Sequence, residues 1–117
     1  MNDTRSHVRL AGLAGLAILL AACVSPVEEA RQKETAETQV GLAQAYLQQN
    51  DVRQAMPVAL KAVELDPQNL DAQLTLGRIY HMEGRWDQAL EAYQKALALD
   101  PANRRARELL KILRVVR

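Results

Sequence analysis

The chain has 117 residues, a formal net charge of +1 and a single cysteine. Its length favours one domain, its near-neutral charge does not indicate a general polyanion-binding protein, and one cysteine excludes an intramolecular disulfide. Because phenylalanine is absent, the core has to be built from Leu, Ala, Val and Ile, a composition that predicts an all-α fold of closely packed helices.

The N-terminus has the pattern of a secretory signal. Arg5 and Arg9 precede thirteen uncharged and mostly apolar residues, 10–22. A helix of this length spans about 20 Å, which is less than the roughly 30 Å hydrocarbon core of a membrane. Residues 1–22 are therefore interpreted as a signal peptide rather than as a permanent transmembrane helix.

The residues Leu20-Ala21-Ala22-Cys23 follow at the end of this segment. They resemble a bacterial lipobox, and the resemblance implies cleavage before Cys23 and acylation of its thiol. Each buried methylene contributes about 0.8 kcal/mol, so two or more acyl chains attach a protein lastingly to a membrane. By the same resemblance, Val24 indicates the outer membrane of a bacterial envelope, because Asp at that place commonly means retention in the inner membrane. The alternative is that Cys23 is a buried residue of an ordinary N-terminal helix.

Residues 23–35 would connect the lipidated N-terminus to the rest of the chain as a stalk. Ser25, Pro26 and Glu28 fit a helix start, since Ser can accept an early backbone N–H, Pro suits the first helical position and Glu can reach back. A helix that is polar all round is therefore predicted from residue 26. A disordered tether is the alternative, because a short isolated helix is only marginally stable.

Two consecutive copies of a 34-residue pattern make up most of the remaining chain, because residues 36–69 align without a gap with residues 70–103. The spacing and the residue types resemble the tetratricopeptide repeat, although Gln39 and Gln73 stand where that family has its first Trp. The resemblance implies stacked antiparallel helix pairs that bind protein segments. The matching pairs are Leu42 and Leu76, Ala43 and Gly77, Tyr46 and Tyr80, Ala55 and Ala89, Ala62 and Ala96, Pro67 and Pro101, and Asn69 and Asn103.

Turn and stop signals divide this part of the chain into helices. Asn50 and Gly84 tolerate left-handed geometry at the turns, and Pro67 and Pro101 end the helices before them. Pro57 falls inside a helix, where it removes a backbone hydrogen bond and is expected to bend the helix near its start. The predicted helices are residues 26–49, 52–65, 70–83, 86–99 and 103–115.

Residues 104–117 are expected to form a basic C-terminal capping helix, with six basic residues and one acidic residue. Its Leu side chains would cover the second repeat, whereas Ile112 and Val115 would point toward the concave side. This surplus apolar surface suggests a partner, a second copy of the chain as in a homo-oligomer, or sequence that once followed. The signal peptide and the lack of interleaved aromatic residues argue against nucleic acid. Contact with anionic lipid is more plausible, and a solvated cap that complements an acidic body is the simpler alternative.

Helix pairs of the family stack so that their first helices line a concave groove. By family offset the groove positions with apolar side chains are Val40, Leu47, Leu74 and Met82, and those suited to fixing a bound backbone or acidic group are Gln44, Arg78 and His81. Glu37, Gln48 and Asp71 lie at the remaining positions. The Lys, Asn and Arg ring with which chaperone-tail binders of the family clamp a carboxylate is absent, which excludes that ligand class. The alternative is an ordinary solvated helix face.

The sequence offers no catalytic, metal-binding or cofactor-binding set. His81 is the single histidine after residue 22, and its neighbours four residues away, Gly77 and Arg85, are not metal ligands. No Ser–His–acid or Cys–His set is available, since Cys23 would be acylated, and no glycine-rich phosphate loop is present. Trp86 is expected to be a packing residue. The chain is therefore predicted to be a non-enzymatic scaffold or adaptor.

Three hypotheses for the function follow from these features. The lipobox at Cys23, the acidic stalk and residues 40–49 resemble the outer-membrane pilotin of type IV pilus assembly, which implies a role in assembling a secretin, although this chain has fewer repeats than that family. A general envelope adaptor would bind another outer-membrane assembly factor or a peptidoglycan enzyme. A membrane-surface module would use the basic last helix.

Overall fold

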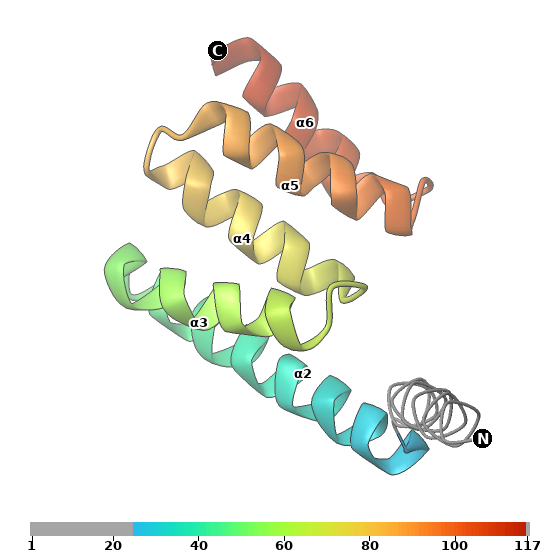
Figure 1. Cartoon of the computed structure of the whole chain (residues 1–117). Coiled ribbons are helices and arrows are strands. Elements are labelled where there is room, and N and C mark those ends of the chain that lie inside the picture. Colours follow the sequence, from blue (N-terminus) through green and yellow to red (C-terminus); the bar gives the residue numbers. More distant parts are fainter. Residues whose placement is uncertain (1–24, 117) are drawn as a thin grey trace, which may run out of the picture. The chain divides into compact units, whose positions relative to one another are not determined.

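The structure is a computed structural model, and it describes residues 25–116. These residues form helices joined by short turns, which confirms the all-α prediction, and each predicted helix boundary is met within one residue (Figure 1). Among these residues no helix is both long enough and apolar enough to span a lipid bilayer. The helices are α2 (Pro26–Gln48), α3 (Val52–Leu65), α4 (Leu70–Met82), α5 (Trp86–Leu99) and α6 (Arg104–Val116).

The chain divides into two compact units, residues 1–31 and residues 32–117. Of the first unit, the structure describes only the beginning of α2, where the Glu28 amide donates to Ser25 Oγ at 3.2 Å. This bond supplies the helix cap that the Ser-x-x-Glu pattern predicts, and residue 26 begins a helix rather than a disordered tether. Cys23 and the signal segment lie outside the described residues.

The two turns within the repeats adopt the expected left-handed backbone. Asn50 between α2 and α3 has φ 60°, and Gly84 between α4 and α5 has φ 73°. Both residue types tolerate a positive φ better than most others, Gly because it lacks a Cβ. The turns therefore reverse the chain at equivalent positions of the two copies.

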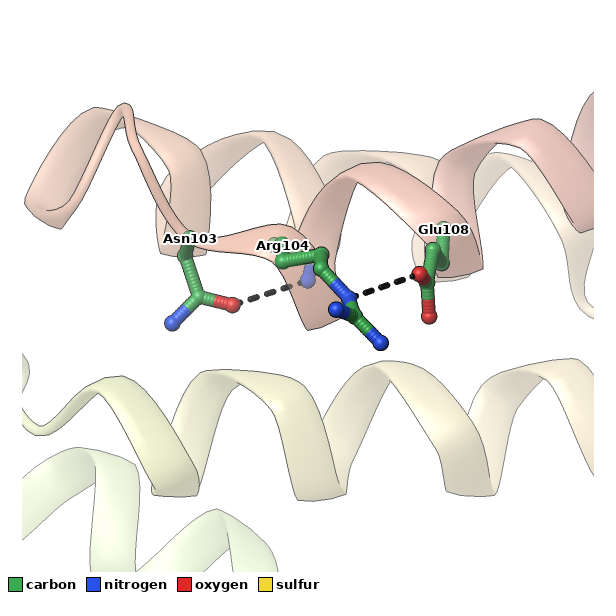
Figure 2. A network of polar contacts seen from close by, with 4 residues as sticks. Asn103, Arg104 and Glu108 are labelled. Atoms are coloured by element: carbon green, nitrogen blue, oxygen red, sulfur yellow. Dashed lines mark hydrogen bonds and ion pairs between the residues drawn. The ribbon is translucent and has the colours of Figure 1, made fainter.

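Besides α2, three further helices begin with a side-chain cap. Asp51 accepts the Gln54 amide at 3.1 Å before α3, and Asn69 accepts the Ala72 amide at 3.0 Å before α4. Asn103 accepts the Ala106 amide at 2.9 Å before α6, where Arg104 also pairs with Glu108 at 3.1 Å (Figure 2). These caps satisfy backbone N–H groups that have no partner inside the helix.

Proline marks the ends of the second helices. Asp66 and Asp100 adopt nearly identical extended backbones, φ −144° and −141°, directly before Pro67 and Pro101. This is the conformation that a following proline imposes, and it confirms the predicted stops. Pro57 lies inside α3, which continues through it to Leu65, so one missing backbone bond is tolerated.

The core of residues 32–117 consists of apolar clusters on both sides of α4. Leu47, Ala55 and Ile79 belong to a cluster that joins α2, α3 and α4. Leu74 and Tyr93 belong to another, which joins α4, α5 and α6. Buried alanines at these contacts let the helix backbones approach closely, as the repeated Ala positions predict.

Candidate functional site

Three of the four apolar groove positions lie in the core. Val40 is 6% exposed, Leu47 8% and Leu74 2%. Val40 packs with Ala62 and Ala72, and Leu74 packs in the α4–α5–α6 cluster. These side chains stabilise the stacking of the helices and offer little surface to a ligand, because a neighbouring helix covers each of them.

The remaining groove residues are more accessible. Met82 is 45% exposed, and Gln44, Arg78 and His81 are half-buried. Gln44 Nε2 donates to Thr75 Oγ1 at 3.4 Å, and the His81 ring lies edge-on to Trp86 with 5.4 Å between the ring centres. Arg78 differs from both, because among residues 25–116 its side chain makes no hydrogen bond or ion pair.

The accessible surface continues from α4 onto α6. Ile112 is 50% exposed and Val116 54%. The 34-residue offset makes Ile112 the equivalent of Arg78 and Val116 the equivalent of Met82, so these four side chains occupy matching places on adjacent first helices. We call this surface the α4–α6 face and define it by Arg78, Met82, Arg105, Ile112 and Val116.

Tyr93 of α5 is buried in the cluster that joins α4, α5 and α6, and it was not among the predicted site residues. Its side chain is fully buried, and its ring rests on Gly77, where a Cβ atom would lie only 2.6 Å from Tyr93 Cδ1. Its hydroxyl has no hydrogen-bond partner among the described residues. Burial raises the pKa of Tyr93 to about 12, and the positive charges of Arg78 and Arg105 oppose that rise.

A signal for Tyr93 does exist in the repeat alignment. The first repeat has Ala43 and Ala59 where the second has Gly77 and Tyr93. One residue becomes smaller and its counterpart much larger, which is the change expected of two residues in contact. Comparing both positions together would have placed Tyr93 against Gly77.

Surface hollows lie away from the predicted groove residues. One of about 120 Å³ lies between α3, α4 and α5 and is lined in part by Val63, Leu76 and Lys95. A second, of about 330 Å³, surrounds the turn at Gly84, and a third, of about 670 Å³, lies at the start of α3. No predicted groove residue lines any of these three.

The chemistry available on the described residues is that of recognition. Within residues 25–116 no three His, Cys, Asp or Glu side chains are grouped so that they could hold a metal ion. The ion pairs there are solvent-exposed, such as Lys95–Glu91 at 2.9 Å, and pairs of this kind contribute little to stability. The α4–α6 face offers exposed apolar side chains and unpaired positive charge.

Solved structures of other proteins share the fold of these helix pairs. The tetratricopeptide domain of Arabidopsis OM64 is 30% identical over 69% of this chain and 67% of that domain, with a TM-score of 0.66. The second such domain of human RPAP3, in complex with an HSP70 peptide, is 24% identical over 68% and 67%, with a TM-score of 0.65. The first such domain of Spaghetti (RPAP3), bound to an HSP90 peptide, is 21% identical over 69% of this chain and 64% of that domain, with a TM-score of 0.67. The chain thus spans about two thirds of the length of these domains, and slightly less of the last.

The family comparison covers most of the repeats. No protein with a curated description matched the sequence. The tetratricopeptide repeat model matches residues 40–104, which is more than half of the chain and contains most of the two copies found in the sequence. The fold of this family is a scaffold for protein–protein interaction. The chain belongs to the tetratricopeptide repeat family.

Proposed function

We propose that this chain is a lipid-anchored scaffold of the bacterial envelope, attached through acylated Cys23, that binds a segment of an envelope protein on its α4–α6 face. The observation that carries the proposal is the exposure of Met82, Ile112 and Val116 beside an unpaired Arg78 in a fold that serves protein interaction. The peptides held by the two RPAP3 domains support a peptide ligand. The sequence before residue 24 supports the anchor.

The partner that we favour is the secretin of a type IV pilus, located with this chain at the outer membrane. The support is the resemblance of the lipobox, the acidic stalk and residues 40–49 to the pilotin of that system. A general adaptor would instead bind another outer-membrane assembly factor or a peptidoglycan enzyme. The genes that neighbour this one separate the two, since pilus genes favour the first.

A second candidate function is a membrane-surface module built on α6. The observation in its favour is that Val115 is 86% exposed on a helix that also carries Lys111 and Arg114. Basic amphipathic helices with exposed apolar residues bind anionic lipid surfaces. Binding to anionic vesicles that falls with salt and with Val115→Asp supports this candidate, and indifference to anionic lipid rejects it. The same apolar surface could pair two copies of the chain, which sedimentation at graded concentration tests.

The lipid anchor is tested by Cys23→Ala with Cys23→Ser as a second variant. We expect the wild-type chain to incorporate labelled palmitate and to fractionate with the outer membrane, and both variants to lose the label. A variant that is cut at the same bond and stays in the membrane fraction contradicts the anchor.

The partner surface is tested by crosslinking in intact envelopes. Ile112→Asp places a charge on the α4–α6 face, and Leu60→Asp places one on α3, where the side chain is similarly exposed (44% against 50%). We expect the secretin crosslink to be lost in the first variant and kept in the second. Equal crosslinking of both variants contradicts binding through the α4–α6 face.

A further inference from the structure

The outer side of α2 is open where the equivalent sides of α4 and α6 are covered by a neighbouring helix. Leu76 of α4 is 7% exposed, because it packs with Ala55 and Ala59 of α3. Its counterpart Leu110 of α6 is equally buried, in the cluster with α4 and α5. Leu42 of α2 is the third member of this series, and it is 42% exposed. The described residues place no helix before α2, which lies with α3 at one end of the stack (Figure 1).

Two neighbours of Leu42 extend this open side into a stripe. Thr38 and Ala45 lie about one helical turn before and after Leu42, and both are exposed. Their counterparts in α4, Ala72 and Ile79, are fully buried. The Thr38 hydroxyl donates to a backbone carbonyl of its own helix at 3.1 Å, so it needs no partner in an interface. The stripe therefore continues the interface that stacks the repeats, but nothing among the described residues covers it.

The surface hollows show the same difference between the repeats. Tyr46 and Val58 line the hollow of about 670 Å³ at the start of α3, and their counterparts Tyr80 and Ala92 line the hollow of about 120 Å³. In the smaller hollow, Val63 of the preceding second helix supplies a further wall. The larger hollow lacks that wall, so it has room for side chains of another molecule.

Opposite charges lie at the two ends of the stripe. Among residues 25–116, the side chains of Glu34 and Arg53 make no ion pair or hydrogen bond. Glu34 lies about 12 Å before Leu42 along α2. Arg53 lines the larger hollow beside Tyr46, which lies about 6 Å after Leu42. We call this surface the α2–α3 edge and define it by Glu34, Thr38, Leu42, Ala45 and Arg53.

An acid at one end and a base at the other make the α2–α3 edge complementary to itself. A symmetric dimer contact uses the same surface of both copies, turned by half a turn about the axis between them. The point midway between Glu34 and Tyr46 lies about 3 Å before Leu42. Antiparallel α2 helices centred there would set each Glu34 opposite Arg53 of the other copy, with the two Leu42 residues about 6 Å apart along the axis.

The exposed apolar residues of α6 do not offer a comparable contact between copies. Arg105, Lys111 and Arg114 are exposed on that helix, and its single acid, Glu108, already pairs with Arg104 at 3.1 Å. A symmetric contact between two α6 helices would therefore bring like charges together, which is unfavourable. Charge thus favours the α2–α3 edge as the surface through which two copies meet.

We propose that two copies of the chain form a symmetric dimer through the α2–α3 edge, in which Leu42 packs against Leu42 of the second copy and Glu34 pairs with Arg53 of the second copy. This interface shares no residue with the α4–α6 face. The dimer therefore presents two α4–α6 faces, and its absence would leave the proposed peptide function standing.

Sedimentation equilibrium of the full chain in density-matched neutral detergent tests the dimer. We expect a monomer–dimer equilibrium at graded concentrations up to about 1 mM. Glu34→Arg and Arg53→Glu should each weaken dimerisation about tenfold, because each turns two attractive pairs into two repulsive ones. An equimolar mixture of the two variants should regain the wild-type affinity, since each mixed dimer has both pairs with opposite charges.

Leu42→Glu tests the centre of the contact, with Leu99→Glu as the control. Leu99 of α5 is similarly exposed, 40% against 42%, and it lies outside the α2–α3 edge. We expect Leu42→Glu to weaken dimerisation about a hundredfold or more, because it places two charges beside each other in an apolar contact. Leu99→Glu should keep the wild-type affinity. Circular dichroism checks that both variants keep wild-type helicity, and the exposed charge variants test the same contact without touching its apolar part.

The remaining outcomes contradict the inference. A wild-type chain that stays monomeric at about 1 mM overturns it. So does a dimer whose charge variants do not regain affinity on mixing. A dimer that Val115→Asp dissociates and Leu42→Glu does not is assigned to α6. A monomeric chain that loses the secretin crosslink with Leu42→Glu uses the edge for a partner protein, which also overturns the dimer.

Discussion

The two repeats follow the same template but fill their interiors differently. In the first repeat Ala43 and Ala59 face each other across α2 and α3, both fully buried in a cluster with Leu47 and Ile79. In the second repeat Gly77 leaves room on α4 for the whole ring of Tyr93. The same pair of helices therefore accommodates two small side chains or one aromatic ring.

This difference shows that the two positions require side chains of complementary shape rather than particular residues, since Ala with Ala and Gly with Tyr both close the contact. Protein interiors are close-packed, so a ring at one position requires that its counterpart give up a Cβ. The exchange also has a polar consequence, because the Tyr93 hydroxyl is buried where the first repeat has only methyl groups. The second repeat therefore has a buried polar group at a position where the first repeat has none.

Removing the ring is expected to have the largest effect. Tyr93→Ala leaves a cavity between α4, α5 and α6, and truncating a buried aromatic residue costs about 3–5 kcal/mol. At the equivalent place Ala59→Gly should cost only about 1 kcal/mol, from helix propensity. Urea unfolding followed by circular dichroism measures both. Equal losses would mean that the repeats are packed alike.

The second-largest expected effect is a loss of stability at alkaline pH, caused by Tyr93 of the second repeat. The unfolded chain loses the Tyr93 proton near pH 10, whereas burial holds the folded-state pKa at about 12. Between these values the folded state binds more protons, so the free energy of unfolding falls as pH rises through that window, by about 2–3 kcal/mol in total. Comparing the wild type with Tyr93→Phe isolates this effect. An identical alkaline loss in the two proteins would contradict it.

Adding a methyl group at Gly77 should lower the free energy of unfolding by somewhat less than alkaline pH does. Gly77→Ala places a methyl group against the Tyr93 ring, and overpacking of this kind costs about 1–3 kcal/mol. Gly41→Ala is the control, because no atom lies within 4 Å of its added Cβ, and there the substitution should stabilise α2 by about 0.5–1 kcal/mol. Thermal or urea unfolding distinguishes the destabilisation expected of Gly77→Ala from the stabilisation expected of Gly41→Ala. If Gly77→Ala combined with Tyr93→Ala costs as much as the two single losses added together, the residues do not form the coupled pair inferred here.

The smallest effect concerns the helix starts of the two repeats. Asp51 caps α3 through its side chain, whereas Arg85 before α5 makes no side-chain cap. Asp51→Ala should therefore cost about 1 kcal/mol. Arg85→Ala should cost less than about 0.5 kcal/mol, through loss of exposed contacts. Comparable losses in urea unfolding would show that capping does not distinguish the repeats.

The helices and their boundaries were predictable because their signals are local. Pro67 ends the helix before it whatever packs against that helix. Asn50 can adopt its φ of 60° because of its own residue type, whatever its tertiary neighbours are. Likewise, Asn103 and Asp51 precede helices with side chains that can accept a backbone N–H. Each feature depends on a few consecutive residues, so the tertiary neighbours do not alter it.

The candidate site was only partly predictable, because exposure depends on which helix covers a position. Family offset placed Leu74 beside Arg78 in the groove, but α6 packs over Leu74 and leaves Arg78 accessible. Ile112 was expected to point toward the concave side, and it is half exposed. The absence of a partner for Arg105 could not be read from the sequence, since it requires knowing which acidic side chains come close.

The sequence by itself determined the all-α class, the repeat length of 34 residues and the places where the chain turns, because these follow from local conformational preferences and from periodicity. The tertiary structure decided what lies on the surface. It placed Tyr93 on Gly77, buried its hydroxyl without a partner and left Arg78 and Arg105 unpaired. The physical reason is that packing and charge pairing join residues far apart in the chain, which no local signal encodes.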